Sequence, residues 1–135
     1  MSHHTRGRKA APQPIADAVR KVPPAPKHWP VAAKKEWKRV MPVLVERRVL
    51  SQGDLHAAER FCEAAADIAA ARAAISESKE YIENARGELK RHPAFATLRE
   101  ATAESRRWAA ELGLTPAARS RAGVHEDDED NPLDL

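Results

Sequence analysis

The chain has 135 residues, with 23 Lys or Arg, 20 Asp or Glu, and a formal net charge of +3. This length suits one small domain with tails, and it excludes a large core. Alanine is abundant and strand-forming residues are sparse, so the composition predicts a mainly α-helical protein. The single Cys62 excludes an internal disulfide bond, and no apolar run reaches the length of a membrane span, which together predict a soluble cytoplasmic protein.

The charge is unevenly distributed along the chain. Residues 126–135 hold six acids and no base, so the remaining residues carry 23 bases against 14 acids. A basic body predicts a polyanionic partner, and an acidic tail can compete for the same basic surface or offer a separate docking strip. A simpler explanation is that these charges serve only to keep the protein soluble.

Residues 1–28 are predicted to form a flexible basic arm. Five prolines interrupt this segment, and its apolar content is too low to offset the entropy of ordering it. Such an arm can gain order when it lies along phosphates. Its candidate DNA-binding residues are Arg6, Arg8, Lys9, Arg20 and Lys21.

A first helix is predicted from about Val31 to Arg48, directly after Trp29 and Pro30. Pro42 lies inside it and lacks a backbone donor, so a kink or a break near Arg39 is expected. The inner stripe comprises Trp37, Val40, Met41, Leu44 and Val45, and we expect Trp29 to be partly exposed. The bases on the outer surface are Lys34, Lys35, Lys38 and Arg39, which could grip DNA or form an ordinary solvated face.

A long helix is predicted from Ser51 to about Ser78, with a capping-box-like start at Ser51 and Asp54. Its apolar face comprises Leu55, Ala58, Phe61, Ala65, Ile68 and Ile75. At roughly 40 Å it is longer than one small domain needs, so it must pack against something. The short turn before it predicts either an αα-hairpin or a helix-turn-helix, which would place Gln52, His56 and Arg60 toward a DNA groove.

The next segment alternates apolar and charged residues around Tyr81 and then reaches Gly87, which predicts a short β-hairpin or an extended turn. His92-Pro93 then opens a helix from about Ala94 to Leu112, which ends at Gly113. Its inner side is predicted to comprise Phe95, Leu98, Thr102, Ser105, Trp108 and Leu112, with Trp108 structural like Trp37. Thr115-Pro116 opens a short final helix with Arg119 and Arg121, and disorder is expected beyond Gly123.

These elements predict a mainly α fold: a helical hairpin with a long central helix, a short β-hairpin or extended turn, a further C-terminal helix pair and flexible tails. The expected divisions are a basic arm over 1–28, a helical DNA-binding and oligomerisation domain over 29–122, and a disordered acidic tail over 123–135. No motif for catalysis is present. The glycines are too scattered for a phosphate-binding loop, and the histidines lack metal-ligand spacing, so we expect no enzyme activity, no cofactor and no metal.

The order of these motifs resembles the phage terminase small subunit family. The resemblance covers about residues 24–121 and includes Trp37 and Pro42 in the first helix, VLSQGD before a helix with FCEA, a hairpin, RHPAF, and LGLTPAARSR. It implies a non-enzymatic, ring-forming homo-oligomer above dimer in the bacterial host cytoplasm. Its implied partners are double-stranded viral DNA and the large terminase subunit, which contains the ATPase and the nuclease. No membrane partner is expected.

Two other interpretations stay open from the residues alone. A helix-turn-helix transcriptional regulator would be a dimer with a compact recognition helix. A helical adaptor would use its charges only for protein contacts, and it would show no salt-dependent DNA binding. The turn at Arg48, Val49 and Leu50 differs from relatives, in which a glycine is common, and Gly53 lies in the first turn of the long helix.

Overall fold

The computed structural model describes residues 15–122. Its elements are α1 (Val31–Glu46), a 3₁₀ turn η1 (Gln52–Asp54), α2 (Leu55–Glu77), β1 (Tyr81–Glu83), β2 (Leu89–Arg91), α3 (Ala94–Glu111) and α4 (Pro116–Ala122). The predicted fold is confirmed: it is mainly helical, with a long central helix, a short antiparallel hairpin and a C-terminal helix pair. The predicted tails at 1–14 and 123–135 lie outside the described residues.

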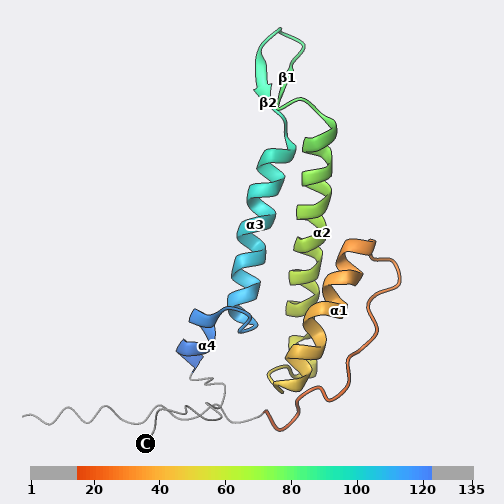
Figure 1. The fold of residues 1–135 in the computed structure, drawn as a ribbon, viewed down its shortest axis with the longest axis vertical. Coiled ribbons are helices and arrows are strands. Elements are labelled where there is room, and N and C mark those ends of the chain that lie inside the picture. The colour runs from red at the N-terminus through yellow and green to blue at the C-terminus, as the bar shows by residue number, and fades with distance from the viewer. Residues whose placement is uncertain (1–14, 123–135) are drawn as a thin grey trace, which may run out of the picture.

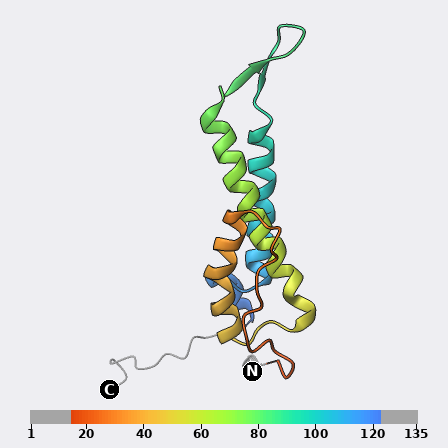
Figure 2. The ribbon, with the colours of Figure 1, turned by 90° about the vertical axis from the view of Figure 1, so that its right-hand side faces the viewer.

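The three longer helices lie side by side, and each runs opposite to its neighbour along the chain (Figures 1 and 2). α2 is the central element, with α1 beside its first half and α3 along its length. Of the two arrangements left open for α1 and α2, this is the antiparallel αα-hairpin. The β1–β2 hairpin projects from the far end of α2 and α3, away from α1 and α4 (Figure 1).

The core is concentrated around α1, where apolar side chains meet the first half of α2. Met41, Leu44, Val40 and Cys62 are the largest side chains that are fully buried. Burial raises the pKa of the Cys62 thiol to about 12, with a smaller contribution from Glu36, so this thiol stays protonated near neutral pH. Its role is therefore packing.

Residues 15–30, here called the strap, are ordered against this core. The Val19 backbone N–H donates to the Leu50 carbonyl at 2.7 Å, and Trp37 Nε1 donates to the Pro23 carbonyl at 2.8 Å. Trp29 is only 6 % exposed and meets Trp37 edge to face, with 5.5 Å between the ring centroids. The expectation of a flexible arm is therefore wrong for residues 15–28, and that of a partly exposed Trp29 is also wrong.

Pro42 does not break α1, which is continuous from Val31 to Glu46. The expected break near Arg39 is therefore wrong. Proline removes the amide that would otherwise bond the carbonyl four residues earlier, at Lys38. Both Pro42 and Lys38 are exposed, so water can satisfy that carbonyl at little cost.

The start of the long helix follows the predicted capping box. The Ser51 backbone N–H and hydroxyl both donate to Asp54 Oδ2, at 3.0 and 2.8 Å, and these bonds lower the pKa of the Asp54 carboxyl. The first turn, which carries Gly53, is 3₁₀, and α2 proper begins at Leu55. The structure therefore shortens the predicted helix by a few residues at this end.

The α2–α3 contact is a seam of small residues at heptad spacing. Ala64 and Ala71 on α2 and Ala94 and Ala101 on α3 are buried, and each pair is seven residues apart. Thr102 is exposed, so its predicted place on the inner side of α3 is wrong. The inner positions advance in alternating steps of three and four: Ala94, Leu98, Ala101, Ser105, Trp108 and Leu112. The alanines were overlooked because bulkier residues dominate a periodicity count.

Helices α1 and α3 each end in a turn of the Schellman type. In α3, Gly113 takes the left-handed conformation, with φ 67°, and the Leu114 N–H donates to the Ala109 carbonyl at 2.8 Å. In α1 the equivalent residue is Arg48, with φ 53°, and the Val49 N–H donates to the Leu44 carbonyl at 3.5 Å. Arg48 thus occupies a position where glycine is favoured.

Replacing Arg48 by Gly is expected to raise the free energy of unfolding by about 1 kcal/mol, because glycine has no Cβ to strain at this φ. For a domain of this size the midpoint of thermal unfolding should rise by roughly 4–8 °C. Circular dichroism on heating provides the measurement. Arg48→Ala is the matched control, since it removes the same charge and keeps the strain; an equal rise in both variants would contradict this explanation.

Candidate nucleic-acid interface

The positive charge of the described chain lies on its first third. Residues 15–50 hold nine bases and three acids, whereas residues 51–122 hold eleven of each. These first residues form the strap, α1 and the turn into α2. A polyanion would therefore be attracted to this part of the molecule.

The basic face of α1 comprises the predicted residues Lys34, Lys35, Lys38 and Arg39. Lys35, Lys38 and Arg39 are exposed and Lys34 is half-buried. Residues three and four apart are neighbours on a helix surface, so the structure brings these four together. Arg39 donates to Glu36 through Nε at 3.0 Å, which partly neutralises it and raises its pKa. Within residues 15–122 the three lysines make no ion pair, so they are the bases that can meet phosphates.

A second basic group lies at the opposite end of α1. The antiparallel bridge between Ala18 and Ser51 holds the strap beside the turn after α1. It thereby brings Arg20 and Lys21, both predicted and both exposed, to the same region as the exposed Arg48. We call Arg20, Lys21, Arg47 and Arg48 the turn cluster.

Arg47 and Arg48 were missed by the sequence analysis. They looked like the last residues of a regular helix, and only the Schellman turn after Glu46 takes them out of it. The Arg47 guanidinium donates to the Gly113 carbonyl at 3.4 Å and so links the ends of α1 and α3. A signal was available: two adjacent bases directly before a helix–helix turn.

Arg6, Arg8 and Lys9, the other predicted DNA-binding residues, lie outside the described residues. Arg121 lies in α4, and Arg119 is half-buried there. Apart from the exposed Lys27 of the strap, the bases of residues 15–50 belong to the basic face or to the turn cluster. These two groups are roughly 20 Å apart at 1.5 Å per residue along α1.

The start of α2 is poorly suited to reading DNA as a recognition helix. Gln52, His56 and Arg60 are all exposed, as such a helix requires. Arg60, however, is paired with Glu63, and Asp67 follows one turn later. Carboxylates on this surface repel phosphates.

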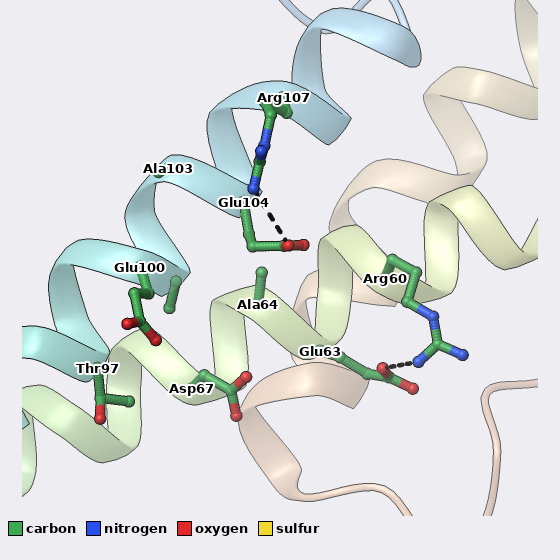
Figure 3. A pocket seen from close by; sticks show the side chains of 10 residues that line it. Arg60, Glu63, Ala64, Asp67, Thr97, Glu100, Ala103, Glu104 and Arg107 are labelled. Atoms are coloured by element: carbon green, nitrogen blue, oxygen red, sulfur yellow. Dashed lines mark hydrogen bonds and ion pairs between the residues drawn. The ribbon is translucent and has the colours of Figure 1, made fainter.

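A groove of about 450 Å³ lies between α2 and α3 (Figure 3). Its charged lining contains Arg60, Glu63, Asp67, Glu100, Glu104 and Arg107. Arg107 is paired with Glu104 at 3.3 Å, and Arg60 is paired with Glu63, so Asp67 and Glu100 stay uncompensated within the lining. Figure 3 shows these two side chains extending from opposite helices. The groove is therefore acidic, and it does not compete with α1 for a polyanion.

Comparison with known proteins identifies the family. The family described as phage terminase, small subunit, matches residues 33–129, which include nearly all of α1 and the whole of α2, α3 and α4. The chain belongs to the phage terminase small subunit family. No curated protein and no solved structure matches it significantly. The predicted family is thus confirmed over more than half of the chain.

This family generally provides the non-catalytic subunit of the terminase. Residues 15–122 contain no cluster of three or more His, Cys, Asp or Glu side chains arranged to hold a metal ion. Among these residues, no helix is both long and apolar enough to cross a lipid bilayer.

Proposed function

We propose that this chain recognises viral DNA at the packaging site and delivers it to the large terminase subunit as a non-catalytic homo-oligomer above dimer, acting in the cytoplasm of the bacterial host. The DNA-binding part rests on the charge division of the fold. The strap and α1 are basic, whereas residues 51–122 have no net charge and α2 and α3 together hold seven acids, five bases and an acidic groove. Family membership makes viral DNA the polyanion.

The DNA contact is proposed to be mainly electrostatic. Long, flexible lysines on the basic face suit phosphates rather than base edges, and the turn cluster provides a second anchor at the other end of α1. Arg6, Arg8 and Lys9 add three positive charges in the sequence that precedes the strap. The affinity should consequently fall steeply as salt rises.

Oligomerisation is proposed because α2 is only partly covered within one chain. α1 lies beside the first half of α2 only (Figure 1), and Ala69, Ala70 and Ala73 in the second half are exposed. We expect multi-angle light scattering at micromolar concentration to give a mass above that of a dimer. A monomer would exclude this assembly, and a dimer would favour a helix-turn-helix regulator.

The acidic tail is proposed to dock on the large subunit. Residues 126–135 lie outside the described residues, and their sequence holds six acids together with Leu133 and Leu135. Deleting them is expected to weaken binding to the large subunit, to leave oligomerisation intact, and to leave DNA affinity unchanged or increased, because negative charge is removed. Titration of both partners into the truncated protein provides the measurement.

A matched variant separates charge from apolar contact in this tail. Changing all six acids to Asn or Gln while keeping both leucines should preserve part of the binding to the large subunit if the leucines contribute contact area. Unchanged binding of the large subunit after the full deletion would contradict the docking role. Tighter DNA binding in that case would mark the tail as a competitor for the basic surface.

A further inference from the structure

The β1–β2 hairpin has apolar side chains that stay exposed among residues 15–122. Leu89 is 74 % exposed, Tyr81 53 % and Ile82 40 %. The hairpin projects beyond the ends of α2 and α3 (Figures 1 and 2), and it meets α3 through Arg91, whose guanidinium carbon lies 3.9 Å from the centroid of the Phe95 ring. An isolated two-stranded hairpin is at best marginally stable in water, so a partner would stabilise it.

The hydrogen-bond register shows which backbone groups are available to a partner. The His92 N–H donates to the Glu80 carbonyl and the Asn84 N–H to the Glu88 carbonyl, at 2.7 and 2.9 Å. In an antiparallel ladder, residue pairs whose backbone groups bond each other alternate with residue pairs whose backbone groups point away from each other. The pairs Tyr81–Arg91 and Glu83–Leu89 therefore direct their N–H and C=O groups outward. Residues 15–122 provide no backbone partner for them.

The two open edges carry opposite charge. β1 has the sequence YIE, with one acid and no base, and Glu80 precedes it; β2 has the sequence LKR, with two bases and no acid. Pairing β2 with β2 would bring four bases together and is disfavoured. Pairing β1 of one copy with β2 of another places acids beside bases.

We propose that the β1 edge of one copy pairs with the β2 edge of the next copy of this chain, so that the hairpins form a continuous antiparallel ladder between subunits. This inference rests on the proposed homo-oligomer and names a surface that builds it. The contact is head to tail, since each copy uses a different edge toward each neighbour. Rotation about one axis places an upward β1 beside a downward β2, which is the antiparallel arrangement. Tyr81 and Leu89 side chains lie on the same face of such a ladder and would be covered together.

The direct test is a disulfide trap between single-cysteine variants of the full chain. Full overlap of the two edges places Glu83 of one copy opposite Leu89 of the next. We expect Glu83→Cys and Leu89→Cys chains, co-expressed with different tags, to form a disulfide-linked heterodimer under mild oxidation. Either variant expressed alone should form several-fold less homodimer. Cys62 does not interfere, because it is fully buried.

Backbone variants provide an independent test. Leu89→Pro removes an outward N–H and leaves the bonds inside the hairpin intact, whereas Leu89→Thr keeps that N–H and shortens the apolar side chain. We expect Leu89→Pro to raise the concentration at which the oligomer dissociates at least tenfold, and Leu89→Thr to raise it less. Circular dichroism should show unchanged helix content in both, because the hairpin lies outside the core.

The outcomes distinguish this inference from the proposed function. Two results would overturn the hairpin pairing but not the proposed oligomer. One is an oligomer above dimer that forms no mixed disulfide, and the other is a Leu89→Pro variant that dissociates at the same concentration as the natural chain. Homodimers that form as readily as heterodimers would also overturn it, since they indicate like edges. A monomeric natural chain would overturn both.

Discussion

Replacing Trp37 by Ala is expected to lower the free energy of unfolding by about 3–5 kcal/mol. Trp37 is 3 % exposed, its ring meets Trp29 edge to face, and its Nε1 donates to the Pro23 carbonyl at 2.8 Å. The truncation removes apolar contacts from the core and also releases the strap. Total stability of a domain this size is typically about 5–15 kcal/mol, so the loss is a large fraction of it.

Urea denaturation followed by circular dichroism provides this measurement. Trp37→Phe should cost less, since it keeps most of the buried area and loses only the bond to Pro23. Trp108→Ala is a second control: its ring is half-buried and its Nε1 bonds Glu104 on the same helix, so the expected loss is smaller. A loss below about 1 kcal/mol in Trp37→Ala would contradict the central place of this residue in the core.

Changing Lys34, Lys35 and Lys38 together to Gln is expected to weaken double-stranded DNA binding by roughly 100-fold near physiological salt. The estimate assumes one phosphate contact for each lysine, and each contact contributes about 0.9 to the slope of log K against log salt. The slope should therefore fall by up to about 2.7. Fluorescence anisotropy over a series of salt concentrations measures both quantities.

A charge-matched control separates position from net charge. Changing Arg72, Arg99 and Arg106 to Gln removes three positive charges from exposed positions on α2 and α3. This variant should keep most of the slope, because these residues lie within residues 51–122, which together have no net charge. An equal loss of slope in both triple variants would show that only the total charge matters.

Local sequence patterns were sufficient for the helices and the hairpin. Helical periodicity located α1, α2 and α3, and Gly87, with φ 78°, marked the turn of the hairpin. The lysines of the basic face were also accessible to prediction, because residues three and four apart on a helix must be neighbours. These features depend on residues close together in the chain.

The strap and the turn cluster depend on contacts that a local pattern does not contain. Prolines in residues 15–28 suggested flexibility, and order comes instead from Val19 and Pro23, which bond Leu50 and Trp37 far along the chain. Trp29 is buried because these contacts hold the strap, which carries it, against the core. Arg47 and Arg48 join the basic surface because Arg48 takes the left-handed backbone conformation, at a position where glycine is usual.

The location of the DNA contact is tested most directly by photo-cross-linking. The full chain would be bound to double-stranded DNA that carries photoreactive bases, and the cross-linked peptides would be identified by mass spectrometry. The proposed DNA contact predicts cross-links within residues 1–50, on the basic face, the turn cluster and the segment that contains Arg6, Arg8 and Lys9. Cross-links concentrated on α3 or around the acidic groove, with none in residues 1–50, would contradict it.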